Sequence, residues 1–382
     1  MNELVRDIES NADIYLARLS QTVAQPSISS QGEGLMEMAD MLSGMLSKIG
    51  FQVELVPTDG APVILAQMDG RGKDTLLFYN HYDVQPVDPL EDWTTPPFEP
   101  AVRDGKLYGR GTADNKGATV ARMCAVESYC RVRGKPPLNL VWVIEGEEEI
   151  GSPHLDQFVD AQRDLLSGVI GCVWEAGGKN ARERYEIALG CKGLLYVELA
   201  ARGAARDLHS ALAAIVPSPT WRLIWALESI KDDRGRIHIP GFHDQIRPPT
   251  PAQREAVADW DFPEEDARAI YGIDAFLDNL TGDELKECLI FGPTCNIDGF
   301  HAGYGGPGGK TVLPNAARAK IDFRLVPDQR PERVLELLRA HLDAQGLSDV
   351  EIVWSEGEAP AAGDPTDPFV QTAIRAAEAV YG

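Results

Sequence analysis

Four apolar segments alternate with polar, helix-like segments in the first half of the chain, and each predicts a strand. They lie at residues 62–70, 74–84, 138–149 and 168–178. Between the second and the third, residues 115–134 predict a helix that ends at Gly134. Strands that are apolar on both faces and alternate with helices are typical of parallel sheets. We therefore expect an α/β fold whose mostly parallel sheet is covered by helices on both faces.

The pattern changes after residue 193. We expect strands at 194–201, 317–327 and 349–357, and helices at 218–233 and 331–346. Amphipathic helices combined with alternating strands are typical of a two-layer α+β domain. The sequence thus predicts a first domain over 1–193, an inserted α+β domain over 194–358, and a return to the first domain over 359–382.

Composition supports this organisation and excludes some partners. A chain of 382 residues is longer than one ordinary hydrophobic core accommodates, so we expect two domains. Lys and Arg total 36 against 59 Asp and Glu, a formal charge of −23, which argues against nucleic acids and anionic membranes as partners. We find no apolar run that would serve as a signal peptide or membrane span. The six cysteines form no CxxC pair, which favours a reducing, cytoplasmic setting.

Polar side chains follow the predicted strands where each strand ends. His81 ends the second apolar run, a cluster of glutamates at 145–149 ends the third, and Glu175 ends the fourth, while Asp114 precedes the predicted helix. In open α/β sheets, ligands bind at the edge formed by the C-terminal ends of the strands. Carboxylates and an imidazole crowd together only if something neutralises them, and divalent cations do so. Imidazole with carboxylates favours zinc, with manganese or cobalt as alternatives.

Each of these residues also has a more ordinary interpretation. A strand-end histidine such as His81 is commonly a turn residue, and a glutamate run is commonly a solvated loop. Asp114 suits the N-cap of a helix. Their joint occurrence at successive strand ends is what favours a metal site.

Several motifs together resemble one known family. They are "HYDVQP" at 81–86, "DGKLYGRGTADNKG" at 104–117, "EGEEEIGS" at 145–152 and "PTCNIDGFHAGYGGPGGKTVLPNAARAKIDFRLVP" at 293–327. The chain resembles the co-catalytic zinc exopeptidases and amidohydrolases, the aminoacylase and carboxypeptidase G-like group, and within it the carnosinase-like dipeptidases. The resemblance covers nearly the whole chain.

The resemblance implies a role for each matching residue. The metal ligands would be His81, Asp114, Glu149 and Glu175, with Asp114 bridging two divalent ions and followed by a cis peptide bond. Glu148 would be the general base, and Asp83 would orient His81. His209 would reach the site of the partner subunit in a homodimer, and Asn296 and Arg324 would bind the substrate.

The implied activity is metal-dependent hydrolysis of dipeptides or short peptides with a free C-terminal carboxylate. A metal-activated water would attack and Glu148 would take its proton. An N-acyl-amino-acid deacylase on the same scaffold and a catalytically impaired metal-binding protein are the alternatives. The inserted domain would act as lid and dimerisation domain, with 194–201 as its edge strand.

One implied ligand has no counterpart in the sequence. The resemblance implies a further histidine near the C-terminus, but none of the seven histidines lies after His341. We therefore expect a truncated chain that binds one ion well and the second weakly.

Overall fold

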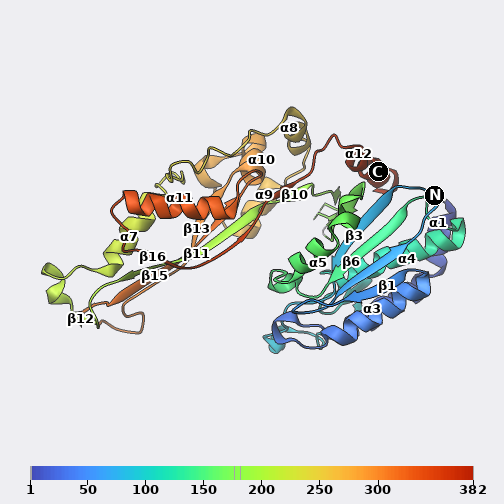
Figure 1. Ribbon diagram of the computed structural model, residues 1–382, viewed down its shortest axis with the longest axis horizontal. Coiled ribbons are helices and arrows are strands. Elements are labelled where there is room, and N and C mark those ends of the chain that lie inside the picture. The colour runs from blue at the N-terminus through green and yellow to red at the C-terminus, as the bar shows by residue number, and fades with distance from the viewer. Residues whose placement is uncertain (1, 176, 181, 382) are drawn as a thin grey trace. The chain divides into compact units, whose positions relative to one another are not determined.

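The structure is a computed structural model, and it describes residues 2–175, 177–180 and 182–381. The chain divides into two compact units, Met1–Glu186 and Ile187–Gly382 (Figure 1). Residues 359–382 group with the second unit, and their return to the first domain stays a prediction. Within the described ranges, every helix is too short or too polar to span a bilayer.

The first unit contains a five-stranded sheet in the order β1-β2-β6-β3-β7. Its strands are β1 (Gln52–Val56), β2 (Val63–Met68), β3 (Thr75–His81), β6 (Asn139–Glu145) and β7 (Gly171–Val173). β3 pairs in parallel with β6 and β7, whereas β2 is antiparallel to both β1 and β6. The predicted mostly parallel sheet is therefore wrong in that half: the sheet is mixed, because the short connection between β1 and β2 allows only a hairpin.

Helices cover both faces of this sheet, as predicted. The unit contains α1 (Asn2–Ser10), α2 (Ala12–Ala24), α3 (Leu35–Ile49), α4 (Lys116–Arg133), α5 (Leu155–Ala161) and α6 (Arg163–Ser167). α3 and α4 lie on one face of the sheet and α5 on the other (Figure 1). Trp142 is fully buried beneath α3 and α4, and Phe158 of α5 is buried on the opposite face. α4 ends where predicted, because Gly134 adopts a positive φ of 76°.

Short elements complete the first unit. They are η1 (Ser29–Gln31), η2 (Leu90–Asp92), η3 (Glu148–Ile150), the hairpin of β4 (Ala101–Arg103) with β5 (Lys106–Tyr108), and the hairpin of β8 (Gly178–Lys179) with β9 (Tyr185–Glu186).

The second unit is built on a four-stranded antiparallel sheet in the order β13-β15-β11-β16. The strands are β11 (Gly193–Arg202), β13 (Thr294–Ala302), β15 (Ala316–Leu325) and β16 (Glu351–Glu358). The prediction that 194–201 forms an edge strand is wrong, because β11 pairs on both sides, with β15 and β16. The two edges are β13 and β16.

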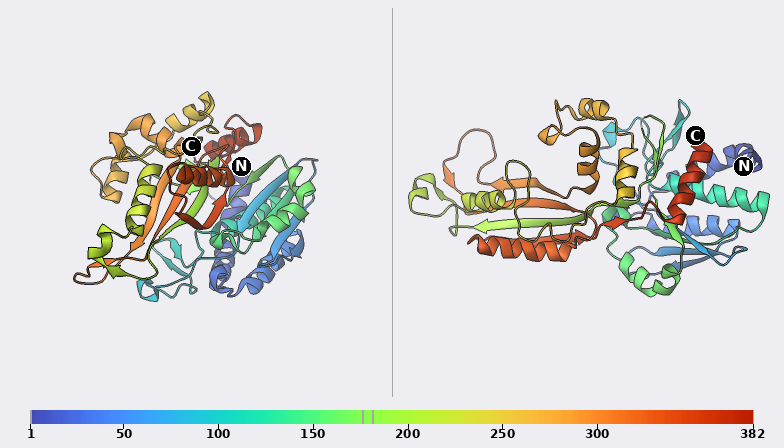
Figure 2. Two further views of the ribbon diagram at one scale, coloured as in Figure 1. Left: turned by 60° about the vertical axis from the view of Figure 1, so that its left-hand side comes forward. Right: turned by 90° about the horizontal axis from the view of Figure 1, so that it is seen from above.

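Two helices cover one face of this sheet. α7 (Pro219–Ile230) and α11 (Pro331–Ala344) pack on it, and Figure 2 shows α11 running along the strands. β15 alternates accordingly: Ile321 and Phe323 are buried beneath the helices, whereas Lys320 and Arg324 are exposed on the other face. This is the two-layer α+β arrangement expected from the sequence.

The remaining elements of the second unit are short or peripheral. They are β10 (Gly190–Cys191) paired with β17 (Ala361–Ala362), β12 (Leu208–His209) paired with β14 (Val312–Leu313), η4 (Ser210–Ala214), η5 (Leu277–Asn279), α8 (Pro251–Ala258), α9 (Glu264–Tyr271), α10 (Gly282–Phe291) and α12 (Pro368–Tyr381).

Candidate metal centre

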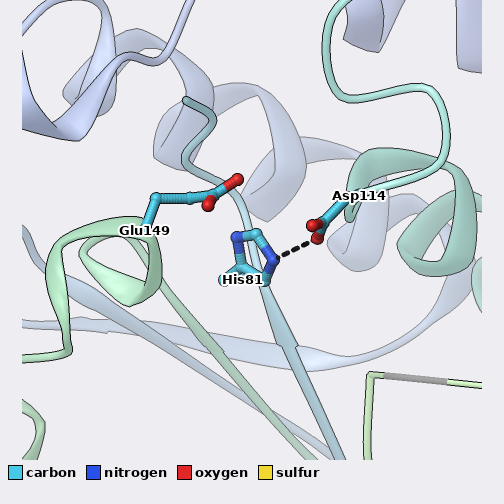
Figure 3. A group of neighbouring side chains, drawn as sticks. All are labelled: His81, Asp114 and Glu149. Carbon is cyan, nitrogen blue, oxygen red and sulfur yellow. Dashed lines mark hydrogen bonds and ion pairs between the residues drawn. The ribbon is translucent and has the colours of Figure 1, made fainter. Parts of the chain in front are cut away.

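The parallel strands of the first unit bring the predicted ligands to one edge. β3 and β6 pair up to the partners His81 and Glu145, so both strands end at the same level. η3 directly follows β6 and carries Glu148 and Glu149, and Glu175 follows β7. The chain segment before α4 brings Asp114 to the same place (Figure 3).

His81 lies at the centre of the carboxylates and is fully buried. Its Nε2 atom lies 2.8 Å from Asp114 Oδ1 and 3.3 Å from Glu175 Oε2. Glu148 Oε2 is 3.9 Å from the same nitrogen. One imidazole nitrogen thus faces three carboxylates.

Asp83 holds the other side of the ring and also the turn that carries two of the acids. Its Oδ1 atom lies 3.2 Å from His81 Nδ1, and its two oxygens accept hydrogen bonds from the backbone amides of Glu148 and Glu149 at 3.2 and 3.0 Å. A proton on Nδ1 directed at Asp83 leaves Nε2 free to act as a ligand. Asp83 is itself fully buried, so its position is fixed.

The donor atoms form two overlapping groups among the described residues. His81, Asp114 and Glu149 make one group, and His81, Glu148 and Glu175 make the other. Within each group the donor atoms lie within 4.8 Å of one another. That separation allows one cation to contact all members of a group after small rotamer changes.

The electrostatics of the cluster favour a cation. Burial lowers the pKa of His81, but its hydrogen bonds to Asp114 and Asp83 outweigh burial and raise the pKa to about 11. Burial raises the pKa of Glu175 to about 7, and its buried Oε2 accepts no hydrogen bond from the described residues. Burial also raises the pKa values of Glu148 and Glu149. A divalent ion would satisfy the orphaned oxygen and offset the repulsion, so these residues fit zinc or a similar metal.

Three predicted site residues belong to the second unit. Asn296 and Arg324 lie on the neighbouring strands β13 and β15, two residues apart in register, and both are exposed. His209 is exposed at the start of η4, where its Nδ1 accepts a hydrogen bond from the amide of Ala211 at 3.2 Å. Their roles toward substrate stay predictions.

Other residues that contact the candidate ligands were not among the sequence predictions. Gln85 donates a hydrogen bond from Nε2 to Glu149 Oε2 at 2.9 Å. The one feature of the sequence that could have pointed to Gln85 is its place in the polar segment after β3. Asn80, fully buried one residue before His81, donates to Asn115 Oδ1. The Asp114–Asn115 peptide bond is cis, as the resemblance implies.

Comparisons with known proteins match the chain to a peptidase family. The family model "Peptidase family M20/M25/M40" matches residues 77–382. The Cys-Gly metallodipeptidase of Schizosaccharomyces pombe is 29% identical over 90% of this chain and 75% of its own length. The Beta-Ala-His dipeptidase of Rattus norvegicus is 30% identical over 90% of this chain and 74% of its own length.

Solved structures are similar over both units. The M20 family metallo-carboxypeptidase of Sulfolobus solfataricus is 37% identical, with a TM-score of 0.88 over 96% of this chain and 84% of that one. Human carnosine dipeptidase 1 is 29% identical, with a TM-score of 0.75 over 100% of this chain and 85% of that one.

Replacing Asp83 tests the arrangement behind the histidine. We expect Asp83→Ala to weaken zinc binding by about 10–100-fold, because the His81 ring and the turn of Glu149 lose the same carboxylate. Competition against a chromophoric chelator measures the change. The control Asp160→Ala removes an exposed carboxylate on α5 and should leave the affinity unchanged. Equal zinc affinity in Asp83→Ala and wild type would show that Asp83 does not support the site.

Proposed function

The chain belongs to peptidase family M20/M25/M40, and on that premise we propose that it hydrolyses dipeptides or short peptides with a free C-terminal carboxylate. It is a metallopeptidase, and the relatives above include dipeptidases. The observation that carries the proposal is the cluster of carboxylates around Nε2 of His81. Its donors suit two divalent cations, with zinc as the first choice and manganese or cobalt as alternatives.

Glu148 has the position and environment of a general base. When bound, divalent cations lower the pKa of a water and polarise a carbonyl. The Glu148 side chain is 35% exposed, so its carboxylate reaches solvent and substrate as well as the cluster. Burial raises its pKa above that of an ordinary glutamate, which strengthens it as a base. Glu148 takes the proton of the attacking water and returns it to the leaving nitrogen.

His81, Asp114, Glu149 and Glu175 hold the cations in this proposal, and Asp83 orients the imidazole. Arg324 binds the carboxylate at the substrate's C-terminus, since a guanidinium offers a carboxylate two parallel hydrogen bonds. Its contact with Asp322, 3.6 Å from Nε, leaves most of its donors free of any ion pair among the described residues. Asn296, on the adjacent strand, faces the same exposed side and contributes an amide to the substrate.

The second unit carries features of a dimer surface. The edge strand β13 exposes Ile297 and Phe300, which with Ile224 and Leu227 of α7 line an open cavity of about 520 Å³. In the described part of the chain β13 pairs on one side only, and a free strand edge beside an exposed apolar patch favours association with a second copy. We place the homodimer interface there, with His209 of each chain serving the site of its partner.

A substrate panel tests the activity. We expect hydrolysis of dipeptides with a free carboxylate, and a KM at least about tenfold higher for the same dipeptides with an amidated C-terminus, because Arg324 loses its charged partner. Arg324→Met should raise the KM of dipeptides with a free carboxylate but not the KM of the amidated dipeptides. The control is Arg330→Met, elsewhere in the same unit, which should change neither KM. Faster turnover of N-acyl amino acids than of any dipeptide would instead favour the deacylase.

Glu148→Gln distinguishes a base from a ligand. We expect kcat to fall by about 10²–10⁴-fold while the affinity for zinc stays within about twofold of wild type, since the amide cannot accept the water's proton. Glu37→Gln, on the exposed side of α3, should change neither. Retained turnover would refute the role as base, and a matching loss of zinc would make Glu148 a ligand.

Mixing two inactive variants tests the shared site. A heterodimer of Glu148→Gln with His209→Ala contains one site with both residues intact, so random exchange should restore about a quarter of the wild-type rate. A mixture of Glu148→Gln with Glu175→Gln should stay inactive, because both lesions fall in the first unit. No recovery in the first mixture, despite a dimer in sedimentation, would exclude the exchange of His209.

A further inference from the structure

The main chain of Glu175 lies past the end of the hydrogen-bonded pairing between β3 and β7. β3 and β7 pair through three positions, and the last pair is Phe78 with Val173. On its opposite side β3 remains paired with β6 as far as His81. His81 is therefore fixed by the sheet, whereas Glu175 needs other contacts to keep its distance from His81.

Arg122 supplies contacts at the point where the ladder stops. This residue of α4 donates from Nη1 to the carbonyl oxygens of Tyr79 at 2.7 Å and Val173 at 3.2 Å, and from Nη2 to the carbonyl oxygen of Trp174. These carbonyls belong to the last paired residue of β7 and to the residues just past the ladder. One planar guanidinium thus joins the ends of both strands.

A second set of bonds connects Arg122 to the other ligands. Arg122 Nη1 donates to Asn80 Oδ1 at 2.6 Å, and Trp142 Nε1 donates to the same oxygen at 3.0 Å. Asn80 in turn donates to Asn115, whose Nδ2 donates to the Glu175 carbonyl oxygen at 3.4 Å. The residues adjoining His81, Asp114 and Glu175 are therefore linked in one network that contains Arg122.

Two other contacts of the main chain or ring in residues 174–175 are found among the described residues. The Trp174 ring stacks on Tyr79, with centroids 3.8 Å apart, but the Trp174 side chain is about half exposed. The amide of Asn115 is at the long end of hydrogen-bond distances. In the described part of the chain, the other hydrogen bond to the main chain of residues 174–175 comes from Arg122, at Trp174.

We propose that Arg122 is a positioning residue of the metal centre, which sets the separation of His81 and Glu175 and so the affinity for the ion between them. The proposal rests on the proposed metal site. Lysine cannot replace Arg122, because one ammonium cannot reach the carbonyls of both strands and Asn80 in a fixed plane. The guanidinium acts through the backbone and touches neither metal nor substrate.

Cobalt titration of the full chain, stripped of metal by a chelator, tests this role. We expect Arg122→Met and Arg122→Lys to weaken the tightest ion by about 10–100-fold and to shift its visible spectrum toward that of Glu175→Gln. The matched control is Arg131→Met on the same helix, where Arg131 is exposed and pairs with Asp7 and Glu127. It should keep the wild-type affinity and spectrum.

Thermal unfolding of the metal-free variants separates positioning from stability. If Arg122 were only structural, Arg122→Met would lower the Tm of the metal-free chain and keep the wild-type cobalt affinity, which would overturn the proposal. Wild-type cobalt affinity in Arg122→Lys would also overturn the proposal. If Arg122→Met does not fold, Arg122→Lys alone provides the test. A wild-type chain that binds no cobalt would overturn the metal site itself, a result distinct from equal binding by variant and wild type.

Discussion

The first unit depends on one electrostatic constraint, the crowding of carboxylates around a buried imidazole. Asp114, Glu148 and Glu175 approach the same nitrogen of His81, and an oxygen of Glu175 is buried without a hydrogen bond from the described residues. Such a group is stable only when positive charge is placed among the acids. Partial burial raises the pKa values of Glu148 and Glu175, because negative charge is unfavourable there, and a divalent cation would offset that charge.

The ends of the parallel strands bring these acids and the imidazole together. β3 and β6 end together, which sets His81 beside the turn that carries the acids. Asp83 contacts the ring on one side and the turn through two amides, so a single buried carboxylate holds candidate ligands from two segments. Arg122 has the corresponding position on the side of β7, where the ladder is short. The candidate metal centre thus has such contacts on the sides of both β6 and β7.

The sequence predicts the parts of this arrangement that follow from chain order. His81 and the glutamates after β6 were predictable, because long apolar runs end abruptly in charged groups. The antiparallel pairing of β2 with β6 was not, since it depends on which strands meet in space. The interior place of β11 was missed for the same reason. Arg122 left no signal, because its partners are backbone carbonyls and one amide side chain.

The most direct test of the central claim is anomalous diffraction at the zinc edge from crystals soaked in zinc. The expected result is a peak about 2.1 Å from His81 Nε2 and about as close to an oxygen of Glu175 or Asp114. Zinc peaks only at other residues, with His81 still hydrogen-bonded directly to Asp114, would contradict it.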